Sequence, residues 1–219
     1  MGERSRFIRD KNLSGAGAIL IFISFFSSGF TPPFGSGILG LIGLIIMLIG
    51  VKGLSDYYNE PDIFNNILYG SITWIVGSIV AVGAAISIVL ASITDFLYKI
   101  YPGWNGDWRS LSGLTPDTSN LQLSDVLPFL EAALIVFVIL FITVIIVAFF
   151  YRRSLIELKQ RSGIGLFGTS GTILLLGAIL TIILIGYVIV WISMLLIAIA
   201  FFQLRPPPKQ TDQSTPSPP

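Results

Sequence analysis

Few side chains in this sequence of 219 residues suit catalysis or metal binding, because it contains neither cysteine nor histidine. Their absence excludes disulfides, thiolate zinc sites, histidine-ligated haem and any Ser-His or Cys-His pair. Only carboxylates, tyrosine, serine and threonine are left for reaction chemistry. We therefore predict that the protein is not an enzyme and has no catalytic residues, no metal site and no cofactor.

The densest group of polar and aromatic side chains lies in the segment 52–62. It contains Lys52, Ser55, Asp56, Tyr57 and Tyr58. Tyrosine suits a membrane surface, since its ring is apolar and its hydroxyl is polar. The segment therefore has two interpretations, a set of interfacial anchors or a partner-binding surface, and the sequence leaves both open.

A second aromatic group, with Tyr101, Trp104 and Trp108, lies among glycines and prolines in a longer polar segment. Clustered tyrosine and tryptophan side chains bind cations, sugars or proteins, but they also form the aromatic belts of membrane proteins. The two aspartates nearby are too few for a calcium site, which needs about six oxygen ligands or more. Glu131, further along the chain, is the remaining candidate for an external contact.

The segments that must position these groups are apolar. With 53% hydrophobic and 11% charged residues, and a mean hydropathy of +0.84, the chain falls outside the soluble class. A helix needs roughly 20 apolar residues to cross a hydrocarbon core of about 30 Å. We predict an all-α, polytopic transmembrane bundle with six spans, at about 13–30, 35–51, 65–93, 127–151, 166–185 and 186–204. We also expect an external loop over about 95–126 and a disordered, proline-rich cytoplasmic tail over 205–219.

The last two spans come from one uncharged stretch of 42 residues, 163–204, and reading it as a single span gives the alternative of five. Lysine and arginine are retained on the cytoplasmic side of short loops. Six spans leave only Lys99 and Arg109 outside, so 11 of the 13 basic residues lie inside, whereas five spans also move Arg205 and Lys209 outward and leave 9. We therefore expect six spans with both termini in the cytoplasm, and a first span that is retained rather than cleaved as a signal peptide.

Internal similarity supports the same division. A shift of 154 positions lays segment 14–20 on segment 168–174, which aligns a run of small residues followed by Gly, Ile and Leu. This match predicts two related helical hairpins, one near each end of the chain.

Small residues on the third predicted span are spaced three or four positions apart and therefore share one helical face. They are Gly70, Thr73, Gly77, Ala81 and Ala84. Membrane helices associate by close packing, which small residues allow, so we interpret this stripe as a helix-packing surface. Gly43 of the second span is interpreted in the same way. No acidic or basic residue lies in the central part of any predicted span, so the sequence marks no ion pathway or proton relay.

Several segments are similar to a family of small archaeal integral membrane proteins known as domain of unknown function 996. The resemblance is carried by LSGAGAIL at 13–20, GVKGLSDYY at 50–58 with IFNN at 63–66, GLFGTSG at 165–171 and GAIL at 177–180. Together these segments extend over most of the chain, and the second is the most specific. The resemblance implies a multi-pass protein of an archaeal plasma membrane, and it implies no particular activity.

The absence of catalytic groups and of charges within the spans favours a non-enzymatic structural or accessory subunit. Such a protein binds the lipid bilayer, other membrane proteins or further copies of itself. The alternative is a small transporter or channel, because repeated helical hairpins in transporters often bracket a central binding site. A net charge of +1 gives no electrostatic reason to expect a nucleic acid partner.

Overall fold

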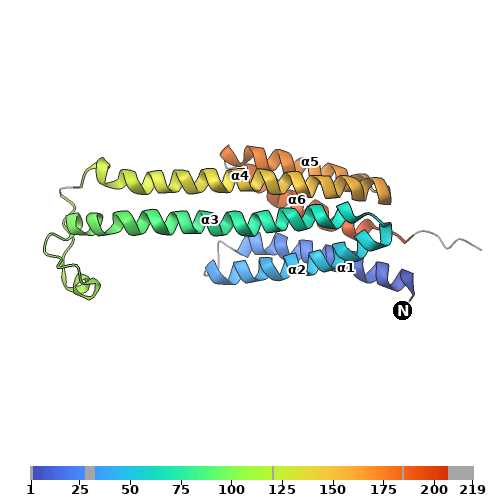
Figure 1. Cartoon of the computed structure of the whole chain (residues 1–219), viewed down its shortest axis with the longest axis horizontal. Coiled ribbons are helices and arrows are strands. Elements are labelled where there is room, and N and C mark those ends of the chain that lie inside the picture. Colours follow the sequence, from blue (N-terminus) through green and yellow to red (C-terminus); the bar gives the residue numbers. More distant parts are fainter. Residues whose placement is uncertain (1, 28–32, 120, 184, 207–219) are drawn as a thin grey trace, which may run out of the picture. The chain divides into compact units, whose positions relative to one another are not determined.

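The structure, a computed structural model, describes residues 2–27, 33–119, 121–183 and 185–206. Within these residues the chain is helical and contains no strand, which confirms the predicted all-α class. The elements are α1 (Glu3–Ser27), α2 (Pro33–Tyr58), α3 (Pro61–Ile100), η1 (Trp108–Gly113), α4 (Leu123–Ser162), α5 (Gly165–Leu180), η2 (Thr181–Ile183) and α6 (Ile185–Gln203). Figure 1 shows them in chain order, from α1 in blue to α6 in red. The predicted tail lies outside the described residues from position 207 onward.

Five helices among the described residues are long and apolar enough to cross a membrane, which indicates a multi-pass membrane protein. They are α2 from Gly37, α3, α4, α5 together with η2, and α6. Helix α1 differs, because the sequence ERSRFIRDK at its start carries charges over more than two turns. That α1 crosses the membrane stays a prediction. The total of six membrane spans and the cytoplasmic position of both termini also stay predictions.

Helices α3 and α4 are longer than the spans predicted at 65–93 and 127–151. Each contains 40 residues, which corresponds to about 60 Å, or about twice the thickness of the hydrocarbon core. Charged residues are compatible with a helix, so α3 continues beyond the predicted span. It ends at Ile100, because Pro102 disfavours helical backbone in the residue before it. At its other end α4 is followed by Gly163, whose φ of +73° is the left-handed conformation that commonly ends helices.

The chain divides into two compact units, one formed by Met1–Gly70 with Ala148–Pro219 and the other by Ser71–Val147. In the first unit α1 packs against α2 and α6, and α5 packs against α6. The uncharged stretch 163–204 therefore forms two helices that contact each other, with η2 between them. The second unit contains the remaining parts of α3 and α4 with their connection.

Glycines bring the backbones of α1 and α2 into contact, and we call this interface the α1–α2 seam. A Cβ atom built on Gly17 would lie 2.4 Å from the backbone nitrogen of Met47 and 2.5 Å from the carbonyl oxygen of Gly43. One built on Gly50 would lie 2.4 Å from the backbone nitrogen of Ser14. Because these neighbours are backbone atoms, α1 and α2 can approach this closely only where glycine leaves room between them.

Aromatic and polar contacts join α6 to α1 and α5. The ring of Trp191 stacks on Phe22 with centroids 4.6 Å apart, and its Nε1 donates a hydrogen bond to the carbonyl oxygen of Phe22 over 3.1 Å. The ring centroids of Phe167 and Phe201 are 5.2 Å apart. Such pairs supply both apolar contact and, through the indole N–H, a directional link within the first unit.

The small-residue stripe of α3 contacts α4 within each unit. In the first unit, a Cβ atom on Gly70 would lie 2.7 Å from the Tyr151 ring. In the second unit, one on Gly77 would lie 2.4 Å from Thr143, and Ala81 is buried. Thr73 and Ala84 of the same stripe are half-buried. The arrangement is the close helix packing that small residues allow.

Candidate functional site

The residues predicted as a partner-binding surface lie where α2 ends and α3 begins, and we call this region the α2–α3 corner. The turn passes through Asn59, whose φ of +51° lies in the left-handed region that asparagine tolerates. Ser55 is 2% exposed and donates a hydrogen bond from its hydroxyl to the carbonyl oxygen of Glu60 over 2.8 Å. The Glu60 carboxylate forms an ion pair with Arg161 of α4. Ser55 therefore holds the turn rather than facing the surface.

The two tyrosines of the corner contact the beginning of α1. The ring of Phe7 is 1% exposed, with its centroid 4.6 Å from that of Tyr57 and 6.3 Å from that of Tyr58. The sequence prediction did not include Phe7, although an aromatic residue inside a charged N-terminal segment was an available signal. This three-ring cluster anchors the first turns of α1 to the end of α2.

Lys52 and Asp56 remain at the surface of the corner. The Lys52 ammonium lies 2.6 Å from the Asp56 carboxylate and 5.5 Å from the centroid of the Phe64 ring. Both side chains are more than half exposed, and an exposed pair of this kind contributes about 0–1 kcal/mol. Of the five residues predicted here, these two are therefore the most exposed to a partner, whereas the two tyrosines are half-buried.

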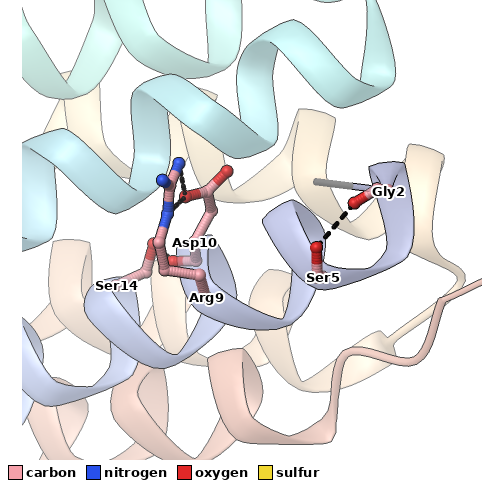
Figure 2. Close-up of polar contacts among 5 residues, drawn as sticks. All are labelled: Gly2, Ser5, Arg9, Asp10 and Ser14. Carbon is pink, nitrogen blue, oxygen red and sulfur yellow. Dashed lines mark hydrogen bonds and ion pairs between the residues drawn. The ribbon is translucent and has the colours of Figure 1, made fainter.

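A buried carboxylate that the sequence prediction missed lies next to the corner. Asp10 is 4% exposed and is the most deeply buried acidic or basic residue in the described part of the chain. Figure 2 shows the Arg9 guanidinium folded onto it, with Nε and Nη2 each 2.8 Å from one carboxylate oxygen. Ser14 donates from its hydroxyl to the backbone carbonyl of Asp10 over 2.9 Å, and Ser5 makes a similar bond to Gly2 over 2.7 Å.

The other carboxylate oxygen of Asp10 lies against α2. A Cβ atom on Gly53 would come within 2.2 Å of it, so the glycine provides the space that the carboxylate occupies. Burying a charge is costly unless it is paired and hydrogen-bonded, and here the pairing comes from Arg9, whose side chain is 57% exposed. The signal in the sequence was an acidic residue within a basic segment directly before an apolar stretch.

The aromatic residues of the predicted external contact occupy different positions. Trp104 is 5% exposed, with its ring centroid 4.9 Å from Tyr98 and 5.5 Å from Trp108, and its Nε1 donates to the carbonyl oxygen of Asp107 over 2.7 Å. Trp108, in contrast, is 58% exposed. Tyr101 is half-buried at the end of α3. Trp104 therefore forms the interior of the loop, and Trp108 is the tryptophan available to a ligand or a membrane surface.

Two further acidic residues of this region lie at the surface of the described structure. Glu131 is exposed on α4. Asp117 accepts hydrogen bonds from the hydroxyl and the backbone N–H of Ser119, which lower the pKa of its carboxyl group below the usual value. In the described ranges no three acidic side chains come together as a metal site would require.

We predict effects of different size from substituting the two tryptophans of the loop. Trp104→Ala should open the loop to proteolysis, with a local destabilisation of about 3 kcal/mol from lost burial and a lost hydrogen bond. Trp108→Ala removes a ring that is 58% exposed and contacts Trp104, so it should lower the protease-resistant fraction less than Trp104→Ala does. Limited proteolysis of the purified protein measures both, and equal sensitivity of the two variants would contradict the burial assigned to Trp104.

Comparison with known proteins gives a family without an assigned function. The model of a protein family of unknown function, DUF996, matches residues 39–195. An uncharacterised protein of the archaeon Methanocaldococcus jannaschii is 23% identical over 195 residues, which cover 89% of this chain and 90% of that protein. No solved structure matches.

Proposed function

We propose that this chain, which belongs to the DUF996 family, is a non-enzymatic accessory subunit that binds another transmembrane helix through an outward face of α3. Lipid tails are as apolar as leucine, so apolar exposure alone does not drive association in a membrane. Small residues do favour it, because they allow two helix backbones to approach closely. Association of α3 with another helix therefore depends on where α3 exposes small residues.

One observation carries the proposal. Gly83, Ser87 and Ala91 are spaced four positions apart on α3 and are all exposed, unlike Gly77 and Ala81 of the stripe that contacts α4. A Cβ atom built on Gly83 would have no atom within 4 Å. The hydroxyl of Ser87 donates to the carbonyl oxygen of Gly83 over 2.8 Å, so its polarity is satisfied within the helix. This face has the composition of a helix–helix contact without a described helix on it.

Crosslinking in native membranes tests this function. The natural chain contains no cysteine, so a Ser87→Cys variant carries a single reactive thiol on the proposed face. A thiol-reactive photocrosslinker attached there should give a product of defined mass. Adding Gly83→Ile should reduce that product by about tenfold or more, because a large side chain would separate the backbones. It should leave folding unchanged, since the position is open.

Val82→Leu is the matched control, because Val82 is 57% exposed but lies on a different face of α3. It should leave the product intact. A product of the mass of two chains would identify the partner as a second copy. Crosslinks to lipid alone, or equal loss of product in both variants, would reject the proposal.

Transport is the competing function, and flux separates it from the accessory role. The α1–α2 seam brings backbones into contact, which supports a sealed interface rather than a polar route between these helices. Liposomes containing the purified protein should therefore show the same ion and solute permeability as empty liposomes. Saturable flux of any solute would favour a transporter.

A further inference from the structure

A cavity of about 700 Å³ opens at the end of the first unit where α5 begins and α6 ends. Its walls come from α1, from the connection between α4 and α5, and from the last residues of α6. They include Lys11, Ser162, Ile164, Phe202, Leu204 and Arg205. None of the lining residues is acidic, whereas two carry positive charges.

Both cations of the cavity lack a carboxylate partner among the residues that the structure describes. The ion pairs within the described part of the chain involve Arg9, Lys52, Lys99 and Arg161, and neither Lys11 nor Arg205. The Lys11 ammonium donates to the carbonyl oxygen of Leu204 over 2.9 Å and approaches that of Phe202 at 3.5 Å. An ammonium group has three donors, so one N–H remains for a ligand. The cavity therefore combines positive charge with a free donor.

The rest of the lining suits a ligand that is part anion and part hydrocarbon. Ile164 and Phe202, the latter 43% exposed, supply apolar surface. Ser162 adds no free donor, because its hydroxyl donates to the carbonyl oxygen of Leu158 and accepts from the backbone N–H of Ile164. Lysine, arginine and hydroxyl groups are the side chains that bind phosphate oxygens in proteins.

We propose that this cavity binds the phosphate of an anionic membrane lipid, with Lys11 and Arg205 contacting the phosphate and Phe202 the hydrocarbon chain. A soluble phosphate ester presents the same anion, but it leaves the apolar wall uncovered. This cavity belongs to the first unit, whereas Gly83, Ser87 and Ala91 of the α3 face belong to the second. Lipid binding is therefore a separate proposal from helix association, and each is tested without the other.

Binding of fluorescent phosphatidylglycerol to the purified full-length protein tests the site, with phosphatidylcholine as the zwitterionic probe. Phosphatidylglycerol should bind more tightly, and Arg205→Gln should weaken its binding about fivefold, the effect of one cation at a membrane surface. Lys11→Gln should weaken it at least as much. Because Lys11 also contacts the end of α6, Arg205→Gln is the decisive variant, and Lys11→Arg should retain binding.

Arg4→Gln is the matched control. It removes the same charge from an exposed residue that does not line the cavity and should leave the affinity unchanged. Equal affinity for the two lipids, or an equal effect of Arg4→Gln, would overturn the proposal. Displacement of the lipid by millimolar inorganic phosphate, with no dependence of affinity on the acyl chains, would assign the cavity to a soluble anion and overturn the lipid site.

Discussion

Substituting Gly50 with alanine is expected to lower the free energy of unfolding by about 2–3 kcal/mol. The added Cβ atom would lie 2.4 Å from the backbone nitrogen of Ser14 and 2.5 Å from the carbonyl oxygen of Asp10. A flexible side chain could turn away from such a contact, but a helix backbone cannot. The α1–α2 seam must therefore widen along its length, with the loss of contacts on both sides of the substitution.

Gly37→Ala is the control for this prediction. Gly37 lies in the same helix with no atom within 4 Å of its Cβ position, and alanine has the higher helix propensity by about 1 kcal/mol. That variant should be neutral or slightly stabilised. Reversible unfolding of the purified protein in detergent micelles compares the two. If Gly50→Ala were as stable as Gly37→Ala, α1 and α2 would not be in backbone contact.

Gly43 illustrates what a sequence indicates about helix packing. Gly43 was interpreted as a packing residue, and in the structure its Cβ position lies 2.9 Å from the carbonyl oxygen of Gly17. Spacing along a helix gives the face that is small, because side chains three and four positions apart lie on one side. It does not give the helix that covers this face, and α3 has one small-residue face against α4 and another exposed.

The external loop shows a second limit. Trp104 and Trp108 have the same side chain, four positions apart, and both were candidates either for an external contact or for an aromatic belt. Their burial differs because the indole N–H of Trp104 donates to the Asp107 carbonyl while Tyr98 and Trp108 cover its ring. That arrangement depends on the path of a nonhelical backbone through Gly106, whose φ is +88°. Periodicity carries no information about such a path.

Asp10 was missed because topology arguments count acidic residues lightly and treat the residues before a span as solvated. In the structure the charged first turns of α1 belong to the same helix as its apolar part and pack on α2. Position 10 shares a face with Ser14 and Gly17, three and four residues apart, and this face is the one in the seam. A carboxylate there is buried by the geometry of the helix.

The ion pair between Arg9 and Asp10 leads to a prediction about which partner matters more. Arg9→Gln should cost more stability than Asp10→Asn, about 1–3 kcal/mol against less than about 1 kcal/mol. Removing the arginine charge leaves a carboxylate that is 4% exposed without its partner. Removing the carboxylate charge leaves a guanidinium that is 57% exposed and that water can solvate. The asymmetry follows from the difference in burial.

A double-mutant cycle with both substitutions measures the pair directly, by the same unfolding transition in detergent. The double variant should be more stable than Arg9→Gln alone, because asparagine needs no counter-charge beside Gly53. Arg6→Gln is the control, since Arg6 is exposed and belongs to the same basic segment. If Arg6→Gln were as costly as Arg9→Gln, the loss would reflect general charge at the start of α1. If Asp10→Asn were the more costly of the pair, the carboxylate would have a stabilising partner other than Arg9.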